Sequence, residues 1–371
     1  MSNIVISHSG HYMPYNPNEP FQLPLLPPGG SLETIQILKA LVGASREIGV
    51  LKGRCNNIPN PMLLMSLAIT KESVESSGIE DIVTTVESVL EGQGLPESEI
   101  KAPDKEVLRY REAMNWGMDN LDKFSISTRL IQGIHKKLIP SSTGYRKQQN
   151  AIKDQRIGKV VYTPPPATEI DRLLQNWENF VNEEASDSPL NPLIRCALAH
   201  YQFEAIHPFM DGNGRTGRIL LVLQLVKERV INYPVLYVSG FLKKFRSAYY
   251  RKLLDVTRNG NWEGFLTFIL TGFENQALKT TLKLLEMMTV YEKLKKGINE
   301  NHRKINAEEF TNHIFYHLIT NPERYRREAG ITHQTASRHL VELRNAQLLK
   351  DFWMGKSHFY FHPELLKLTA K

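Results

Sequence analysis

The sequence predicts a mainly α-helical protein with one short β-hairpin in its middle and a winged helix-turn-helix at its C-terminal end. Apolar residues recur at helical spacing over most of the chain beyond residue 30, and residues 140–166 interrupt this pattern with a loop, a β-prone run and three prolines. The last region reads as helix, helix, turn, helix and strand. We therefore expect an N-terminal arm and helical region over 1–100, a helical core over 101–298 and a winged helix over 299–371.

The composition is that of a soluble protein of two or three domains. A chain of 371 residues is too long for one ordinary core, and no apolar run approaches the roughly 20 residues that span a bilayer, so we expect no membrane contact. No signal peptide is visible, and Cys55 and Cys196 are too few for a disulfide framework or a cysteine zinc site, which predicts a cytoplasmic location. The net charge of +7 favours polyanionic partners, although a solvated surface explains it as well.

The N-terminal third is expected to be an arm followed by helices. Residues 1–30 are rich in proline, asparagine and glycine, which is typical of an arm draped over the body or detached from it. Ser31 is expected to cap a helix whose apolar positions begin at Leu32, and Pro59 and Pro61 separate it from the next. Gly78 is expected to interrupt the chain after that second helix. The helices predicted after the two prolines cover 62–75, 83–91, 105–121 and 128–137.

Beyond the hairpin region, helical patterns resume. A helix over 192–206 should end at His207, because a residue before proline disfavours helical geometry. The run 219–226 is so apolar that its helix should be buried nearly all round. Thr332 is expected to cap the last helix of the C-terminal region. The other predicted helices cover 170–182, 241–254, 263–273, 277–296, 310–318 and 322–329, with a strand over 357–361.

Twelve consecutive residues, His-Pro-Phe-Met-Asp-Gly-Asn-Gly-Arg-Thr-Gly-Arg from His207 to Arg218, carry the chemistry. A glycine-rich turn at a helix N-terminus offers free N–H groups to an anion, and Arg215 and Arg218 can each fork onto phosphate oxygens. Asp211 supplies a hard oxygen ligand for Mg²⁺ on the same phosphates. An ordinary histidine titrates near neutrality, so His207 can take a proton from a hydroxyl. This segment predicts a site for a metal-bound polyphosphate beside a nucleophile.

Other phosphate and metal motifs are excluded by spacing. Gly355-Lys356-Ser357 lacks the earlier glycine of G-x-x-x-x-G-K-(S/T), since position 350 is Lys350, and no H-E-x-x-H occurs. The remaining plain alternative for the twelve residues is a tight turn between helices with surface arginines.

The segment resembles the Fic motif, H-x-F-x-(D/E)-G-N-G-R-x-x-R, at every position. The resemblance implies a Fic-type helical core and transfer of AMP from Mg·ATP to a Tyr, Thr or Ser hydroxyl of a protein. It makes His207 the base, Asp211 the Mg²⁺ ligand, and Arg215 and Arg218 the phosphate clamps. The ATP-binding residues it implies are Gly212, Asn213, Gly214, Arg215, Thr216, Gly217, Arg218, Tyr249 and Tyr250, although a core role for the two tyrosines is about equally expected.

The hairpin resembles the flap of Fic proteins. That resemblance implies that Val160, Val161 and Tyr162 pair with an extended segment of the target through main-chain hydrogen bonds. An ordinary surface hairpin is the alternative.

Residues 76–81 resemble the Fic inhibitory motif, (S/T)-x-x-x-E-(G/N). Ser76 and Glu80 are in register, and Asp81 departs from the pattern at the last position. The resemblance implies that Glu80 occupies Arg218 and keeps ATP from binding productively. A carboxylate on a helix surface is the alternative.

The C-terminal region leaves its partner open. Gln334, Thr335, Ser337 and Arg338 point away from the apolar stripe of their predicted helix and can reach bases or phosphates. Arg324, Arg326 and Arg327 form either a phosphate-contacting cluster or a solvated face. Winged helices also dock proteins, so the fold does not decide between DNA and protein.

Three functional hypotheses follow. The first is an autoinhibited protein adenylyltransferase that uses Mg·ATP and modifies a target protein and itself; the same Glu80 could instead support removal of AMP. The second is a DNA-binding regulator whose Fic core senses nucleotide without turnover. The third is transfer of UMP, phosphocholine or phosphate. DNA and a second copy of the chain are further partners that the sequence leaves open.

Overall fold

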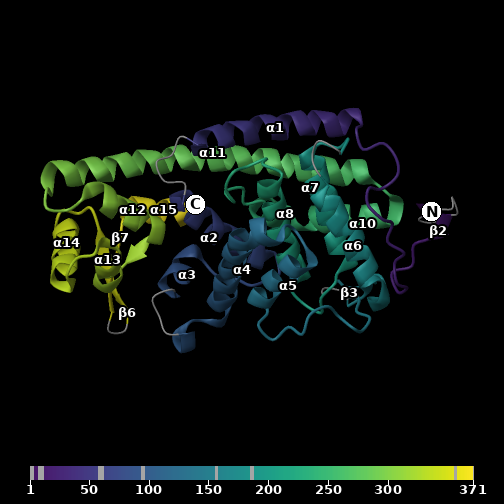
Figure 1. The fold of residues 1–371 in the computed structure, drawn as a ribbon, viewed down its shortest axis with the longest axis horizontal. Helices are drawn as coiled ribbons and strands as arrows, with labels where there is room; N and C mark the ends of the chain where they lie inside the picture. The colour runs from purple at the N-terminus through teal and green to yellow at the C-terminus, as the bar shows by residue number, and fades with distance from the viewer. Residues whose placement is uncertain are drawn as a thin grey trace.

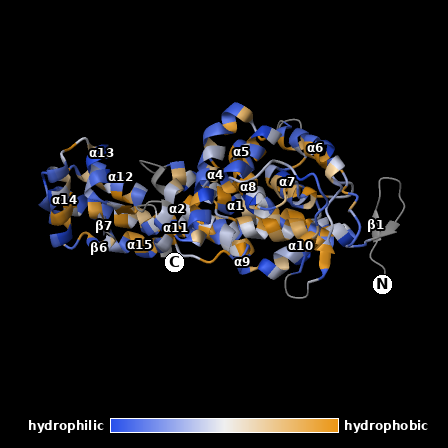
Figure 2. Ribbon diagram, turned by 90° about the horizontal axis from the view of Figure 1, so that it is seen from below, coloured by the Kyte–Doolittle hydropathy of each residue, from blue (hydrophilic) through white to orange (hydrophobic). Residues whose placement is uncertain are grey.

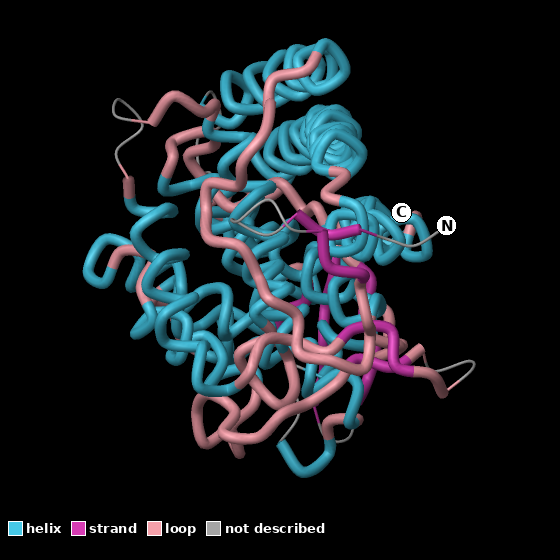
Figure 3. Tube along the Cα trace, turned by 90° about the vertical axis from the view of Figure 1, so that its right-hand side faces the viewer, coloured by secondary structure: helices cyan, strands magenta, loops and turns pink. Residues whose placement is uncertain are grey.

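A computed structural model of the chain describes residues 4–6, 12–56, 62–92, 97–154, 158–183, 188–354 and 357–370. Helices dominate, and the strands are few and short (Figure 3). Pro59, Pro61, Gly355 and Lys356 lie outside the described residues. Within the described part, no helix is both long and apolar enough to cross a membrane.

The N-terminal arm is draped over the core. Its first strands, β1 (Ile4–Ile6) and β2 (Tyr12–Pro14), pair antiparallel. After them, Phe21 and Leu26 are buried, and the Phe21 N–H donates to the Thr163 carbonyl at 2.9 Å. Of the two expectations for the arm, draped over the body or detached from it, the first is therefore confirmed for the residues that follow β2.

Helix α1 (Ile35–Asn56) lies along α11 (Trp262–Asn301) (Figure 1). The prediction that Ser31 caps this helix is wrong. Leu32 is buried in the loop before the helix, and Thr34 Oγ1 accepts the hydrogen bond from the Ile37 N–H at 3.4 Å. Helix α11 joins the two helices predicted over 263–273 and 277–296.

Helix α2 (Met62–Ile79) continues through Gly78, so the predicted interruption there is wrong. A Cβ added at Gly78 would meet only the movable end of the Lys243 side chain, so the helix accommodates this isolated glycine without a break. The predicted single helix over 241–254 is also wrong, because the backbone breaks at Phe245 between α9 (Ser239–Lys244) and α10 (Arg246–Asn259).

Helix α8 lies at the centre of a group of helices and packs against α4, α5 and α7. As predicted, residues 219–225 of α8 are all buried, and hydrophobic residues gather where the core helices face one another (Figure 2). The bulged hairpin is present as well. The elements between α2 and α9 are α3 (Val86–Gly92), η1 (Glu97–Glu99), α4 (Ala102–Phe124), α5 (Thr128–Leu138), β3 (Ile152–Lys153), β4 (Val160–Tyr162), η2 (Ala167–Glu169), α6 (Ile170–Asn182), α7 (Pro192–Ile206) and α8 (Asn213–Lys227).

The C-terminal region has the predicted order of elements, with additional strands. Thr332 Oγ1 accepts from the Thr335 N–H at 3.2 Å, so the predicted cap is present. The strands form an antiparallel sheet in the order β5-β7-β6. The arrangement is compatible with a winged helix. Its elements are α12 (Ala307–His317), β5 (Ile319–Thr320), α13 (Pro322–Ala329), α14 (His333–Asn345), β6 (Lys350–Met354), β7 (Ser357–Phe361) and α15 (Pro363–Ala370).

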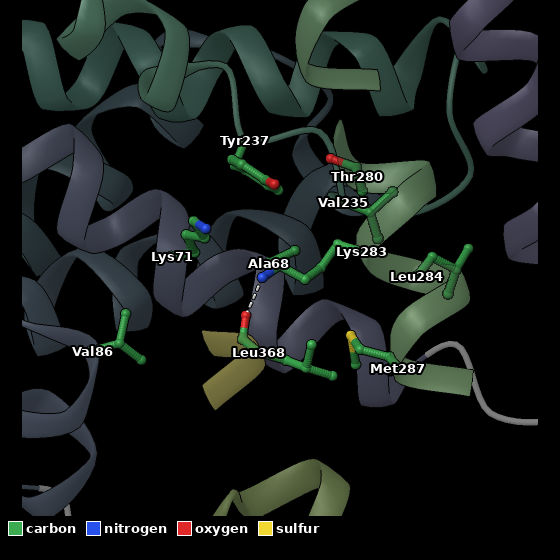
Figure 4. A pocket seen from close by; sticks show the side chains of 10 residues that line it. All are labelled: Ala68, Lys71, Val86, Val235, Tyr237, Thr280, Lys283, Leu284, Met287 and Leu368. Carbon is green, nitrogen blue, oxygen red and sulfur yellow. Dashed lines mark hydrogen bonds between the residues drawn. The ribbon is translucent and has the colours of Figure 1, made fainter. Parts of the chain in front are cut away.

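The last helix returns to the body of the molecule. Lys283 Nζ on α11 donates to the Leu368 carbonyl on α15, beside Ala68 and Lys71 of α2 (Figure 4). The C-terminal region therefore contacts α2, the helix that carries Ser76 and ends one residue before Glu80.

Candidate active site

The first six residues of the twelve-residue segment form a tight loop between α7 and α8, and the last six form the start of α8. His207 ends α7 in the left-handed conformation, with φ 50° and ψ 58°. The Asn213 side chain closes the loop, because its Oδ1 accepts from the Phe209 N–H at 2.8 Å and its Nδ2 donates to the Phe209 carbonyl at 2.9 Å. Asn213 is thus occupied with the loop, and its side chain is not free for a ligand.

His207 is held in the form that a general base needs. Its Nδ1 lies 3.3 Å from the Glu204 carbonyl, which can only accept, so Nδ1 carries the proton and Nε2 keeps its lone pair. Burial lowers the pKa of His207 to about 4, and the positive charge of Arg146 acts in the same direction. The imidazole is therefore neutral at neutral pH, and its side chain keeps partial exposure.

Asp211 and the N-terminus of α8 form the part of the site where the sequence predicts phosphate and its metal ion to bind. The Asp211 side chain is 75% exposed, and its carbonyl accepts from His135 Nε2 at 2.9 Å. Gly212 has φ +74°, and a Cβ there would lie 3.2 Å from Ile139 Cγ1, so glycine suits this position. The first N–H groups of α8 have no acceptor within the helix and carry its positive dipole end.

A magnesium ion fits these residues. One exposed carboxylate beside a phosphate-binding helix end is the kind of protein contribution that Mg²⁺ takes when phosphates and water supply its other ligands. Asp211 would hold the ion.

Glu80 joins the two arginines. Its Oε1 lies 2.8 Å from Arg218 Nη2 and its Oε2 lies 2.9 Å from Arg215 Nε. Ser76 adds two acceptors for Arg218, its Oγ at 2.7 Å from Nε and its carbonyl at 3.1 Å from Nη2. Burial opposes the charge of Arg218, but Glu80 and Glu204 raise its pKa above the usual range. The Glu80 carboxylate is thus paired with both arginines that the motif predicts to bind phosphate.

Gly214 makes room for this contact. A Cβ added there would lie 2.7 Å from Glu80 Oε1 and 2.8 Å from Arg218 Nη1. The glycine therefore lets the carboxylate reach the N-terminus of α8.

Three family models match separate parts of the chain. The Fic/DOC family N-terminal model covers 38–119, the Fic/DOC family model 125–225, and the model of the C-terminal domain of SoFic-like protein adenylyltransferase 290–365. The chain belongs to the Fic/DOC family.

Curated relatives and solved structures agree with this assignment. The protein adenylyltransferase Fic of Drosophila grimshawi is 31% identical over 203 residues, which are 52% of this chain and 39% of that protein. The protein of the same name in Drosophila melanogaster is 30% identical over the same length, 38% of that protein. The chain therefore spans about two fifths of the relatives it matches.

Two crystal structures share the fold. A Fic family protein from Desulfovibrio desulfuricans is 17% identical with a TM-score of 0.59, covering 90% of this chain and 97% of that chain. A Fic domain containing signaling protein from Bacteroides thetaiotaomicron is also 17% identical, with a TM-score of 0.53, covering 66% of this chain and 96% of that chain.

Asp81, the departure from the Fic inhibitory motif, has a conformational explanation. Its φ is 63°, in the left-handed region that glycine and asparagine enter easily and that aspartate tolerates. Its carboxylate also accepts two hydrogen bonds from Arg246, at 2.6 and 2.9 Å. Aspartate can therefore replace glycine or asparagine here without changing the backbone.

The two tyrosines divide between core and surface. Tyr249 is 1% exposed and its hydroxyl lies 2.7 Å from His200 Nε2, whereas Tyr250 is 44% exposed. Thr216 and Gly217 also face inward, since Thr216 Oγ1 donates to the Gly212 carbonyl and a Cβ at Gly217 would lie 2.3 Å from Glu204 Oε1. Of these four, Tyr250 alone presents an exposed side chain to a ligand.

In the flap, Val160 and Val161 are half-buried and Tyr162 is buried. The Tyr162 hydroxyl donates to the Ala205 carbonyl at 2.8 Å, which fixes the hairpin against α7. The Tyr15 hydroxyl from the arm donates to the Val161 carbonyl.

Sequence reasoning missed two residues of the site. Arg146 is 3% exposed, donates through Nε to the His207 carbonyl at 3.0 Å and through Nη2 to the Pro165 carbonyl, and so ties the base to the flap. Glu106 on α4 accepts from Arg215 Nη1 at 2.7 Å. Arg146 lies in the region that resembles the flap, where the sequence assigns it no role, and Glu106 falls in no motif, so only the fold brings them to the site.

The C-terminal arginines do not form one cluster. Arg324 turns inward and donates to the Ile319 carbonyl at 3.0 Å, and Arg326 pairs with Glu323 at 2.6 Å. Arg327 is exposed. On α14, Gln334 and Arg338 are exposed, whereas Thr335 and Ser337 are half-buried.

Proposed function

We propose that the chain is a protein adenylyltransferase that moves AMP from Mg·ATP to a hydroxyl of a target protein and of itself. The observation that carries the proposal is the neutral His207, with Nε2 free, beside a helix N-terminus and two buried arginines. The name of the curated relatives, protein adenylyltransferase, supports the same reaction.

In the proposed reaction, His207 Nε2 takes the proton of the attacking hydroxyl. The oxygen forms a bond to the α-phosphorus, and the bond from that phosphorus to the bridging oxygen breaks, so that diphosphate leaves. Arg215 and Arg218 hold the phosphates of the leaving group. Mg²⁺ held by Asp211 would neutralise their charge.

We propose further that Glu80 is an inhibitory residue. Its carboxylate takes the donors that a terminal phosphate needs, and a displaced phosphate would leave the α-phosphorus out of line with the nucleophile. Withdrawal of Glu80 from the arginines is thus the event that permits productive binding.

The reaction is tested on the Glu80→Gly variant, in which the proposed inhibition is absent. Intact mass measurement after incubation with Mg·ATP should show addition of one or more adenylyl groups. The double variant Glu80→Gly/His207→Ala should show none. Labelled UTP and CDP-choline, run in parallel, should label far less than ATP. Absence of adenylylation in Glu80→Gly, or equal labelling after loss of His207, would refute the proposal.

Removal of AMP is an alternative direction at the same site. The Glu80 carboxylate lies between two arginines at the start of α8, where it could orient an attacking water. Incubation of adenylylated protein with the parent chain and with Glu80→Gly separates the directions, because removal requires Glu80 and addition does not.

DNA contact by α14 is a second proposal. The helix exposes Gln334 and Arg338 next to its capped N-terminus. Binding to mixed duplex DNA should weaken as salt rises, because phosphate contacts release counterions. No binding at low salt would exclude DNA as the partner.

A further inference from the structure

The two phosphate-clamping arginines are held by different parts of the fold. Among the residues that the structure describes, every hydrogen bond and ion pair of the Arg218 guanidinium goes to Ser76 or Glu80, both on or just after α2. Arg215 contacts Glu80 as well, but its Nη1 also donates to Glu106 on α4 at 2.7 Å. Arg215 thus has a carboxylate partner outside the inhibitory segment.

The backbone of Glu106 is anchored by more than α2. Its neighbour Val107 has no exposed surface, and α4 packs against α5 and α8 as well as against α2. The Glu106 backbone therefore keeps supports in the core that do not involve the end of α2. If Glu80 withdraws, Arg218 loses its carboxylate partner and Arg215 keeps Glu106.

Arg215 has donors to spare for a phosphate. A guanidinium has five N–H donors in a rigid plane. Glu106 engages Nη1, Asp211 lies 3.9 Å from Nη2, and Glu80 faces Nε at 2.9 Å. Arg215 Nε makes no hydrogen bond among the described residues although Glu80 Oε2 lies 2.9 Å away, so withdrawal of Glu80 would clear the space beside Nε for a phosphate while Nη1 stays on Glu106.

We propose that Glu106 is a positioning residue that orients Arg215 toward the phosphates of ATP once Glu80 has left. The inference rests on the proposed function and deepens it. Glu106 acts through Arg215 and touches no substrate. A clamp ordered in advance loses less side-chain freedom when the nucleotide binds, so both affinity and alignment improve.

A competing effect has the opposite sign. A carboxylate near phosphates repels them, so its removal could tighten ATP binding. The Glu106 side chain is 39% exposed and its charge is balanced by Arg215 at 2.7 Å, so solvent and the arginine screen it. Orientation of the arginine is therefore the larger effect.

The test compares variants in the Glu80→Gly background. Glu106→Gln keeps an oxygen acceptor in the same place, and Glu106→Ala removes it. Calorimetric titration with Mg·ATP should give weaker binding for Glu106→Ala, and the turnover number for adenylylation should fall about tenfold or more. Glu106→Gln should retain most of both.

Glu112→Gln is the matched control. Glu112 lies on the same helix and pairs with Lys137 Nζ at 2.6 Å, and this variant should behave like Glu80→Gly alone. Unchanged or tighter ATP binding in Glu106→Ala, or equal losses in the Gln and Ala variants, would overturn the positioning role. The binding measurement decides this even if Glu80→Gly alone fails to transfer AMP, a result that would count against the proposed function only.

Discussion

At the scale of single residues, the site depends on which donors and acceptors are already engaged. Asn213 is a fixed residue of the Fic motif and Thr216 stands at one of its variable positions, yet both side chains bond to the backbone of the loop. His207, Asp211 and the two arginines are the motif residues whose side chains face outward or hold an exchangeable partner. The motif therefore specifies the loop as well as the chemistry.

Ser76 should strengthen the hold of Glu80 on Arg218. Its hydroxyl is fully buried and accepts from Arg218 Nε at 2.7 Å. Because a hydrogen bond to a charged group contributes about 1.5–3 kcal/mol, Ser76→Ala should raise the rate of self-adenylylation to a level between the parent and Glu80→Gly. Labelling with ATP measures this.

Ser77→Ala is the control for that experiment. Ser77 is equally buried, and its Oγ has no hydrogen-bond partner among the described residues. It should leave the rate unchanged. A rate for Ser76→Ala that matches Ser77→Ala would contradict the role of Ser76.

The pH dependence of catalysis should reflect the lowered pKa of His207. Burial brings that pKa to about 4, so the imidazole stays neutral across the range in which an ordinary histidine would become protonated. We expect kcat/KM of Glu80→Gly to stay level from pH 8 down to about 5 and to fall at lower pH. An acid limb centred near 6.5 would show that His207 is not held in this environment.

At the scale of elements, the end of α2 is the segment that the account requires to move. It is held at the active site by Glu80 and Ser76, and at the surface by two bonds between Asp81 and Arg246. The exposed Asp81–Arg246 pair contributes little free energy, about 1 kcal/mol or less. The buried contacts with Arg218 therefore dominate the inhibited arrangement.

The C-terminal region should lose stability in acid. His313 on α12 is buried between Glu328 and Thr320, and burial lowers its pKa to about 4; burial also lowers the pKa of His317, which bonds to Glu328 as well. At His313 the unfolded state then binds more protons than the folded state between pH 6.5 and 4, so the free energy of unfolding falls as pH falls, by at most about 1.4 kcal/mol per pH unit. The lowered pKa of His317 acts in the same direction.

Thermal melting of the parent and of His313→Gln between pH 7 and 4.5 measures this effect. The parent should lose more stability than the variant on acidification. Parallel losses would mean that His313 does not contribute to the pH dependence.

At the scale of the whole molecule, local patterns were predictable and long-range contacts were not. The helix end at His207, the buried run in α8, the hairpin and the order of the C-terminal elements all follow from spacing, proline and capping residues. The predictions of a helix cap at Ser31 and of a break at Gly78 were wrong because they used local sequence rules alone. Leu32 is buried before the helix begins, and an isolated glycine at position 78 did not break α2.

The same division holds for the site. A twelve-residue motif was enough to name the base, the metal ligand and the arginines as candidates. Glu106 and Arg146 are separated from their partners by 109 and 61 residues. No spacing in the sequence signals such pairs, and only the packing of α4 against α8 and of the hairpin region against the end of α7 brings them together.

The most direct test of the account is the initial rate of AMP transfer by the parent chain and by Glu80→Gly under the same conditions with Mg·ATP. Glu80 competes with the phosphates of ATP for both arginines, so its removal should raise the rate by about tenfold or more, which corresponds to about 1.4 kcal/mol of activation free energy. Equal rates for the two proteins would contradict the claim that Glu80 controls the site.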